Sequence, residues 1–361
     1  MTLSVGGRRR PSELSNLWQI QAKTKEQDVQ TDYEFLRWDD IIRKYWQRNE
    51  MLLILRYVQV AWFCLSSGMF GRILKTAWPP FIAATAPLLL IAALGVIAMG
   101  AGWGTYEVSA NVGLPTLAAM PMGLLAFVGV LYAGRIIERR INSFWLLRIY
   151  AFTRHQGSGA LQELDERIDA FARRIKEVIH TTDSDEVLIV GHSTGTMIAI
   201  SALARALQIS PEMAAKNPRI SLMTLGHCIP ILSFQPDAQR FRDELKIVAD
   251  ACQIDWIDFT APTDGACFAL IDPLFASGIT PRDGGEKKPK ILSARFATLF
   301  TPATYARMRR NWYRHHFQYL MAGEMKGDYD YFAITAGAET LGDRYQSKPS
   351  VVRYNGLKIF S

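Results

Sequence analysis

Two long charge-free runs dominate the hydrophobic pattern of this chain. The first lies between Lys75 and Glu107, and the second lies between Glu107 and Arg135. Each is longer than the roughly 20 residues that an α-helix needs to cross a bilayer. Aromatic residues, which favour the membrane interface, lie near their ends: Trp78, Trp103, Tyr106 and Tyr132. The pattern therefore predicts a pair of transmembrane helices at about 79–104 and 113–134.

Basic residues flank this predicted hairpin on both outer sides. They are Arg72 and Lys75 before it and Arg135, Arg139 and Arg140 after it. Because short loops rich in Lys and Arg stay on the cytoplasmic side, we expect a multi-pass protein of the cytoplasmic (inner) membrane with both termini on the cytoplasmic side. A formal net charge of +7 is consistent with a surface that rests against anionic lipid.

A third apolar stretch, Met51–Gly71, precedes the hairpin. Arg56 interrupts it, and an arginine at a helix centre costs about 2.5–3.5 kcal/mol on membrane insertion. The charge-free remainder, Tyr57–Gly71, is too short to cross a bilayer. We therefore expect an interfacial helix at about 45–71 rather than a third span.

Outside this membrane unit, short apolar runs alternate with amphipathic segments. Three of the runs are typical of buried strands: Val187–Val190, Arg219–Leu225 and Ile254–Thr260. Helical spacing is found at about 161–179, 195–208 and 237–251. This alternation predicts an α/β fold, with a mostly parallel sheet and helices on both faces. Nearer to the N-terminus, Tyr33–Trp38 and Trp18–Ala22 are expected to add strands to that sheet.

The motif Gly-His-Ser-Thr-Gly at 191–195 follows the first of these strands directly. A strand that ends in G-x-S-x-G and leads at once into a helix is typical of the nucleophile elbow of serine hydrolases, in which a tight turn exposes the serine hydroxyl. We expect glycine at 191 and 195 because a Cβ there would collide with the neighbouring strand or helix. The alternative is a glycine-rich turn that only caps the helix, but the context favours Ser193 as a nucleophile.

A nucleophilic serine needs a base, and the base needs a carboxylate that orients it. With this elbow, the expected order along the chain is Ser, then Asp or Glu, then His. Asp264 lies in the loop after Ile254–Thr260, where such a carboxylate is expected. Asp258 and Asp255 are competitors, but both fall within the strand, where an acid faces solvent or pairs structurally. The pattern favours Asp264 and keeps Asp258 as the alternate.

Two adjacent histidines, His315 and His316, are the candidates for the base. His316 begins a His-x-x-Tyr pattern that follows the acid in several lipase-like hydrolases, which favours it. His315 stays open as the alternate, with a solvated helix position as its plainer explanation. The other histidines fit the expected order less well: His155 and His180 precede the elbow, His192 is inside it, and His227 comes before the acid.

Several short segments form a set that covers most of the chain. They are 33–40 (YEFLRWDD), 185–190 (DEVLIV) running into the elbow, 256–262 (WIDFTAP), 316–320 (HFQYL) and 329–332 (YDYF). Together they resemble a family of bacterial membrane-anchored α/β-hydrolases of uncharacterised substrate. The resemblance implies an α/β-hydrolase fold in which Ser193, Asp264 and His316 are the catalytic triad of a lipase- or esterase-like serine hydrolase.

Members of such a family are expected to begin with an extra strand and a glycine-containing loop that helps to form the oxyanion hole. This chain opens with a polar stretch that contains Arg8, Arg9 and Arg10, so we expect no such strand there. The backbone N–H of Thr194, just after the nucleophile, is expected to be one oxyanion donor in any case. Loss of the other donor costs about 10²–10³ in rate.

Composition adds few further sites. The four cysteines show neither metal-ligand spacing nor a disulfide framework and are expected to be reduced thiols: Cys64, Cys228, Cys252 and Cys267. No phosphate-binding glycine loop or zinc motif occurs, and the basic balance lacks a nucleic-acid recognition motif. We therefore expect no cofactor, no metal and no nucleic-acid partner. The first residues contain no secretory signal pattern.

These expectations divide the chain into three regions. They are 1–40, N-terminal strands of the hydrolase sheet; 41–140, the membrane unit; and 141–361, the catalytic region, with Asp272–Lys290 as a long loop. The predicted activity is hydrolysis of carboxylic esters or thioesters, lipid-derived ones among them, through an acyl-enzyme. The alternatives are an inactive hydrolase-fold scaffold that recruits partners at the membrane, or an acyltransferase that uses the same triad. The expected partners are the bilayer and an acyl substrate, and the sequence sets no oligomeric state.

Overall fold

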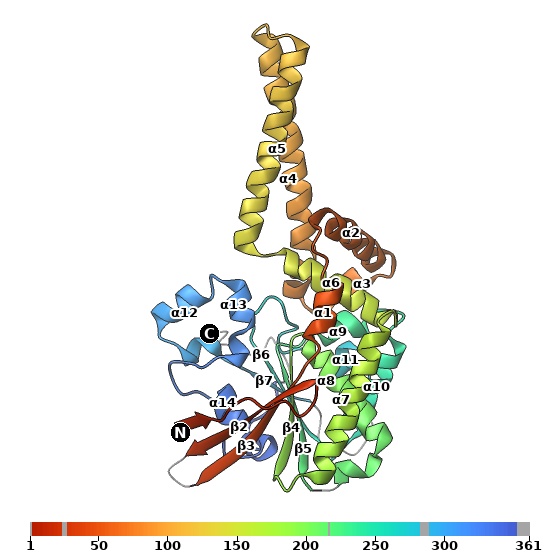
Figure 1. Ribbon diagram of the computed structural model, residues 1–361, viewed down its shortest axis with the longest axis vertical. Helices are drawn as coiled ribbons and strands as arrows, with labels where there is room; N and C mark the ends of the chain where they lie inside the picture. The colour runs from red at the N-terminus through yellow and green to blue at the C-terminus, as the bar shows by residue number, and fades with distance from the viewer. Residues whose placement is uncertain (1, 24–26, 216, 282–288, 352–361) are drawn as a thin grey trace. The chain divides into compact units, whose positions relative to one another are not determined.

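The computed structural model describes residues 2–23, 27–215, 217–281 and 289–351 (Figure 1). The chain divides into two compact units. The first consists of Met1–Trp46, Phe63–Pro80 and Phe152–Ser361, and the second of Gln47–Trp62 and Phe81–Ala151. The predicted catalytic residues all belong to the first unit, and both predicted transmembrane helices fall almost entirely within the second.

A four-stranded parallel sheet forms the centre of the first unit. Its strands are β4 (Glu186–His192), β5 (Arg219–Leu225), β6 (Asp255–Thr260) and β7 (Lys290–Ser293), in the order β4-β5-β6-β7. The first three agree with the apolar runs in the sequence, so a mixed α/β architecture is confirmed. β7 was not predicted, because its four residues have only Ile291 and Leu292 as an apolar core. The predicted loop over Asp272–Lys290 instead contains α11 (Pro273–Ala276) and the start of β7, and its part at 282–288 lies outside the described residues.

Helices α7 (Gln162–Thr181), α8 (Gly195–Ile209) and α10 (Gln239–Asp250) gather on one side of this sheet (Figure 1). α8 follows the elbow and is buried from Thr196 to Leu207 between α7 and α10. Its Arg205 guanidinium is buried and joins all three helices, with ion pairs to Glu244 at 2.7 Å and to Asp165 and Asp169 at 2.8 Å. The helix that follows the predicted nucleophile is therefore held on both sides by charge as well as by apolar contacts.

The C-terminal part of the chain supplies a second apolar cluster. Buried side chains of β5, β6 and β7 pack there against aromatic residues that come late in the chain: Phe296, Phe300, Tyr319, Tyr329, Tyr331 and Tyr345. The short helices of this region are α12 (Pro302–Met308), α13 (Trp312–His316), α14 (Tyr331–Thr335) and α15 (Leu341–Tyr345), with 3₁₀ turns at Phe296–Leu299 and Gln318–Leu320. Residues 352–361 lie outside the described residues.

The N-terminal strands form a sheet of their own, which corrects two expectations. β1 (Thr2–Val5), β2 (Ser15–Lys23) and β3 (Asp28–Leu36) pair antiparallel in the order β1-β2-β3, and within the described ranges none joins the parallel sheet. β1 also occupies the polar start of the chain, where no strand was expected. Short connections favour this local antiparallel pairing, because parallel strands need a long crossover. The small sheet is nevertheless tied to the same unit, through Glu34–Arg174 at 3.0 Å and the Tyr33–Tyr331 hydroxyl pair at 2.9 Å.

The second unit contains two helices that are long and apolar enough to cross a membrane, α4 (Trp78–Asn111) and α5 (Thr116–Ile141). They approach closely where Gly102 faces Gly123, since a Cβ on Gly123 would lie 2.7 Å from the Gly102 carbonyl oxygen. Small residues permit such approaches between membrane helices. α4 extends beyond its predicted bounds at both ends, whereas α5 begins three residues after its predicted start and ends seven residues after its predicted end; Pro87 and Pro121 lie inside them.

The apolar stretch before the hairpin is two helices rather than one. α2 (Glu50–Ser66) and α3 (Met69–Thr76) meet at a bend of 77°. Gly68 lies in the break with a φ of 70°, a backbone conformation that glycine adopts without strain. Taken together, the pair is long and apolar enough to count as a third candidate span.

The structure describes four further helical segments. They are α1 (Asp39–Tyr45), α6 (Phe144–Gly157), α9 (Ile229–Ser233) and a 3₁₀ turn at Pro211–Ala215.

Candidate active site

Ser193 stands in the turn between β4 and α8. Its φ is 54°, a left-handed conformation that costs a non-glycine residue on the order of 1–3 kcal/mol. Hydrogen bonds on both sides hold the turn: the Ser193 N–H donates to the Leu225 carbonyl at 2.9 Å, and the Thr196 N–H donates to the Ser193 carbonyl at 3.1 Å. A strained serine between a strand and a helix is the backbone arrangement of a nucleophile elbow.

Only one of the two motif glycines is required by close contacts. A Cβ on Gly191 would lie 2.7 Å from both the Gly195 carbonyl oxygen and the Thr196 Cα, so β4 and α8 could not stay this close. A Cβ on Gly195 would meet nothing within 4 Å. The expectation that both glycines prevent a collision is therefore right for Gly191 and wrong for Gly195, because the first residue of α8 points into open space.

The structure brings Ser193, His316 and Asp264 together from three separate parts of the chain. The His316 Nε2 lies 2.8 Å from the Ser193 Oγ, and the His316 Nδ1 lies 2.8 Å from the Asp264 Oδ2. Since a carboxylate only accepts, Nδ1 carries the imidazole proton and Nε2 is left to accept from the serine hydroxyl. The side chains of His316 and Asp264 are both buried.

The loop after β6 fixes the Asp264 carboxylate. The Asp264 N–H donates to the Ala261 carbonyl at 2.9 Å, and its Oδ1 accepts from the Ala266 N–H at 3.1 Å. Burial alone raises the pKa of this carboxyl, but the charge and hydrogen bond of His316 and the Ala266 N–H outweigh burial, so the pKa falls below its ordinary value. The carboxylate therefore stays ionised beside the imidazole at neutral pH.

His315, the alternate base, faces away from the serine. Its Nε2 lies 2.8 Å from the Thr263 Oγ1, and its ring packs edge-on against Phe296. Burial lowers the pKa of His315. The expectation of a solvated helix position is wrong, because the side chain is 2% exposed.

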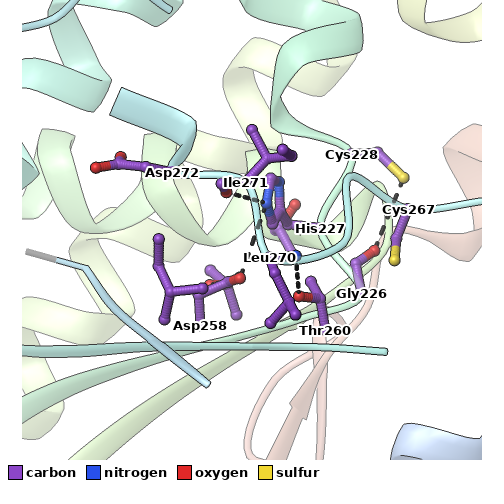
Figure 2. A network of polar contacts seen from close by, with 12 residues as sticks. Gly226, His227, Cys228, Asp258, Thr260, Cys267, Leu270, Ile271 and Asp272 are labelled. Atoms are coloured by element: carbon purple, nitrogen blue, oxygen red, sulfur yellow. Dashed lines mark hydrogen bonds and ion pairs between the residues drawn. The ribbon is translucent and has the colours of Figure 1, made fainter. Parts of the chain in front are cut away.

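Asp258, the alternate acid, belongs to a separate buried network that Figure 2 shows around His227. Its Oδ1 accepts from the Thr224 hydroxyl at 2.6 Å, and its Oδ2 lies 3.8 Å from the His227 Nε2. The His227 Nε2–H donates to the Ile271 carbonyl at 3.1 Å. Asp258 therefore pairs structurally inside the protein and does not face solvent.

Burial favours the neutral form of both groups of this network. It raises the pKa of Asp258 well above the usual range, against the Thr224 hydrogen bond, and it lowers the pKa of His227 to about 4. The Leu270 N–H donates to the Thr260 Oγ1 at 2.7 Å and the Phe268 N–H to the His227 carbonyl at 3.1 Å. These contacts attach the end of the Asp264 loop to the sheet beneath it.

Two contacts around the serine were not assigned from the sequence. The His192 Nε2–H donates to the His316 carbonyl at 2.9 Å, and burial, together with the nearby His316, lowers the pKa of His192 to about 3, which keeps it neutral. The Cys228 Sγ lies 3.7 Å from the Ser193 Oγ, and burial raises the pKa of Cys228 to about 12, which keeps it a thiol. The position of His192 inside the motif was a signal for the first, whereas nothing in the sequence marks Cys228.

Tyr319 explains why a tyrosine follows His316 by one turn. Its hydroxyl accepts from the Ala261 N–H at 2.8 Å, at the start of the acid loop. Its ring lies against Gly226, where a Cβ would come within 2.7 Å of it, and Gly226 also needs its φ of 52°. The segment that carries His316 is thereby docked onto the segment that carries Asp264.

The Thr194 amide is the one candidate for an oxyanion donor that the sequence names. In the part of the chain that the structure describes, its N–H donates no hydrogen bond to another protein group. A free amide beside the serine hydroxyl can stabilise a developing oxyanion.

No protein family, curated protein or solved structure matches the chain. Among residues 2–23, 27–215, 217–281 and 289–351, no group of three or more His, Cys, Asp or Glu side chains could hold a metal ion.

Proposed function

We propose that the first unit is an α/β-hydrolase-like serine hydrolase that cleaves carboxylic esters or thioesters. The observation that supports this most directly is the pair of 2.8 Å contacts that joins Ser193 to His316 and His316 to Asp264. The strained elbow and the charged state of Asp264 support it further. A glycine-rich turn that only caps α8 would require neither a strained Ser193 nor an ionised Asp264.

In the proposed acylation, the Ser193 Oγ attacks the substrate carbonyl carbon while the His316 Nε2 takes the hydroxyl proton. Asp264 keeps the other imidazole proton on Nδ1 and stabilises the imidazolium. The Thr194 N–H stabilises the oxyanion of the tetrahedral intermediate. Collapse of the intermediate breaks the bond to the leaving alcohol or thiol, which receives the proton from Nε2.

Deacylation repeats these steps with water. Nε2 takes a proton from the attacking water, and the second intermediate collapses to the free acid and the Ser193 hydroxyl, which regains the proton. We further propose that α4 and α5 anchor this unit to the cytoplasmic membrane, on the cytoplasmic side. Two observations support that orientation: basic residues flank the hairpin on both outer sides, and no Lys or Arg occurs between Lys75 and Arg135.

Covalent labelling by a fluorophosphonate probe on membranes that contain the full chain tests the proposal. The probe phosphonylates a serine that a working base activates, so the wild type should be labelled and Ser193→Ala should not. The adjacent histidines provide a matched pair: His316→Ala should lose most labelling and His315→Ala should retain it. A folded wild type that does not react would refute the hydrolase and favour the scaffold.

A further inference from the structure

The short helix α3 exposes an apolar and basic face on the first unit. Met69 and Ile73 are buried on its inner side, while Leu74 and Trp78, one turn further on, are 49% and 66% exposed. Arg72 and Lys75 are exposed between them, and the helix has no acidic residue. Large apolar side chains set among basic ones are typical of a surface that lies against anionic lipid.

This helix is anchored to the catalytic unit by contacts of its own. The Arg72 guanidinium lies 5.6 Å from the centre of the Phe234 ring, which ends α9. Near the end of α2, Phe63 lies under the Arg154 guanidinium at 3.8 Å, and Arg154 is paired with Asp237 at 2.8 Å. The exposed face of α3 is thus part of the unit that contains Ser193.

Helix α9 links this face to the candidate nucleophile. It begins after Cys228, which lies 3.7 Å from the Ser193 Oγ, and it ends at Phe234 beside Arg72. Cys228 and Phe234 flank α9 and are six residues apart, which corresponds to about 9 Å at 1.5 Å per residue. The serine is therefore within the length of one acyl chain of the face formed by α3.

A second exposed aromatic residue adjoins α9. The Ser277 hydroxyl, which follows α11, donates to the Ser233 hydroxyl at 2.7 Å, so α11 is held against the end of α9. Phe275 of α11 is 84% exposed, whereas its neighbours Pro273 and Leu274 are buried. An aromatic side chain that is presented in this way has no role in the core of the unit.

The exposed face of α3 lies next to a candidate membrane span, because the chain runs from α3 almost directly into α4. Trp78 is both the exposed residue after α3 and the first residue of α4, the first helix long and apolar enough to cross a membrane. A membrane interface must therefore lie close to Trp78 if α4 spans the bilayer, and tryptophan favours that interface.

We propose that Leu74, Trp78 and Phe275, with Arg72 and Lys75, form a docking surface for an anionic bilayer, which brings Ser193 within reach of esters embedded in that bilayer. The inference rests on the proposed hydrolase and names its substrate class: esters whose acyl chains are embedded in the membrane. A water-soluble ester of a short acid reaches Ser193 without this surface, so the two kinds of substrate respond differently to its loss.

The test uses the full chain in vesicles of phosphatidylcholine and phosphatidylglycerol. Hydrolysis of vesicle-embedded p-nitrophenyl palmitate is compared with that of soluble p-nitrophenyl butyrate. The double variant Leu74→Asp/Phe275→Asp should lower the palmitate-to-butyrate rate ratio by about tenfold or more, because two apolar side chains no longer insert. Ile209→Asp, at an exposed apolar residue at the end of α8, is the matched control and should leave the ratio unchanged.

An unchanged ratio in the double variant, with butyrate still hydrolysed, would overturn the docking surface and leave the hydrolase intact. If the wild type hydrolyses neither ester, the proposed function fails, and a second measurement decides the docking surface. A fluorophore is attached at Phe275→Cys or Ile209→Cys in a Cys252→Ser background, since the other three cysteines are buried. Quenching by spin-labelled lipid is expected at 275 and not at 209, and its absence at 275 would refute the contact with lipid.

Discussion

Replacing Asp264 by Asn tests the arrangement of protons around His316. Oδ1 of Asp264 accepts the Ala266 N–H at 3.1 Å, while Oδ2 faces the His316 Nδ1 at 2.8 Å. An asparagine that keeps the Ala266 hydrogen bond must place its carbonyl at the Oδ1 position and its NH₂ group opposite Nδ1. Two donors would then face each other, so the imidazole proton must move to Nε2.

The consequence for the proposed reaction is large. An imidazole protonated on Nε2 donates to the Ser193 Oγ and cannot take its proton. We expect kcat/KM to fall about 10⁴-fold, the size of loss found when a triad carboxylate becomes an amide. At 1.36 kcal/mol per factor of ten, this corresponds to about 5.5 kcal/mol of transition-state stabilisation.

The assay is hydrolysis of p-nitrophenyl butyrate by the purified full chain, with Ser193→Ala as the background rate. The rate of fluorophosphonate labelling should fall in parallel, because both reactions need the same base. Circular dichroism spectra of the variant and the wild type establish that both are folded. If folded Asp264→Asn retains more than about a tenth of the wild-type kcat/KM, the tautomer argument is wrong.

Two further predictions concern folding rather than chemistry. Gly191→Ala should destabilise the unit by about 1–3 kcal/mol, because the added Cβ overlaps backbone at 2.7 Å, whereas Gly195→Ala should be tolerated; thermal unfolding in detergent compares them, and equal losses would contradict the contact argument. Asp258→Asn should gain stability relative to the wild type as the pH rises above about 4, since the unfolded Asp ionises there while the folded carboxyl stays protonated. Denaturation at several pH values measures this, and a pH-independent difference would mean that Asp258 is ionised in the fold.

The hydrophobic pattern of the sequence predicted those helices and strands that a single run of residues is enough to identify. β4, β5 and β6 contain apolar runs that are partly buried in β4 and mostly buried in β5 and β6, and α7 shows its buried stripe from Leu164 to Ile179 at helical spacing. β7 was not predicted, because its four residues, Lys290–Ser293, are too few to show a hydrophobic pattern typical of a strand. The pairing of β1, β2 and β3 was assigned to the wrong sheet, because alternation along a strand does not say which strand lies beside it.

The choice of base between His315 and His316, and the choice of acid between Asp258 and Asp264, depended on side-chain directions. The spacing of residues along the chain does not determine these directions. Adjacent residues of a helical turn point about 100° apart, so one of His315 and His316 must face away from any given partner. The sequence does not set the rotation of α13, and the structure turns His316 toward Ser193 and His315 toward Thr263. Asp258 pairs structurally, which is one of the two outcomes expected for it, but its contacts with Thr224 on β5 and with His227 after β5 could not be inferred from spacing.

The tie between the N-terminal sheet and the rest of its unit constrains how the chain can thread a bilayer. Glu34 pairs with Arg174 and Tyr33 with Tyr331, so the parts of the first unit that precede and follow the second unit are held together. If α4 and α5 span a bilayer, as we propose, these parts lie on one side of it, and the chain between them crosses it an even number of times. Residues 63–80 belong to the same unit, through the contacts of Phe63 with Arg154 and of Arg72 with Phe234. Under that proposal, α4 and α5 provide the two crossings, and α2 with α3 adds no third one.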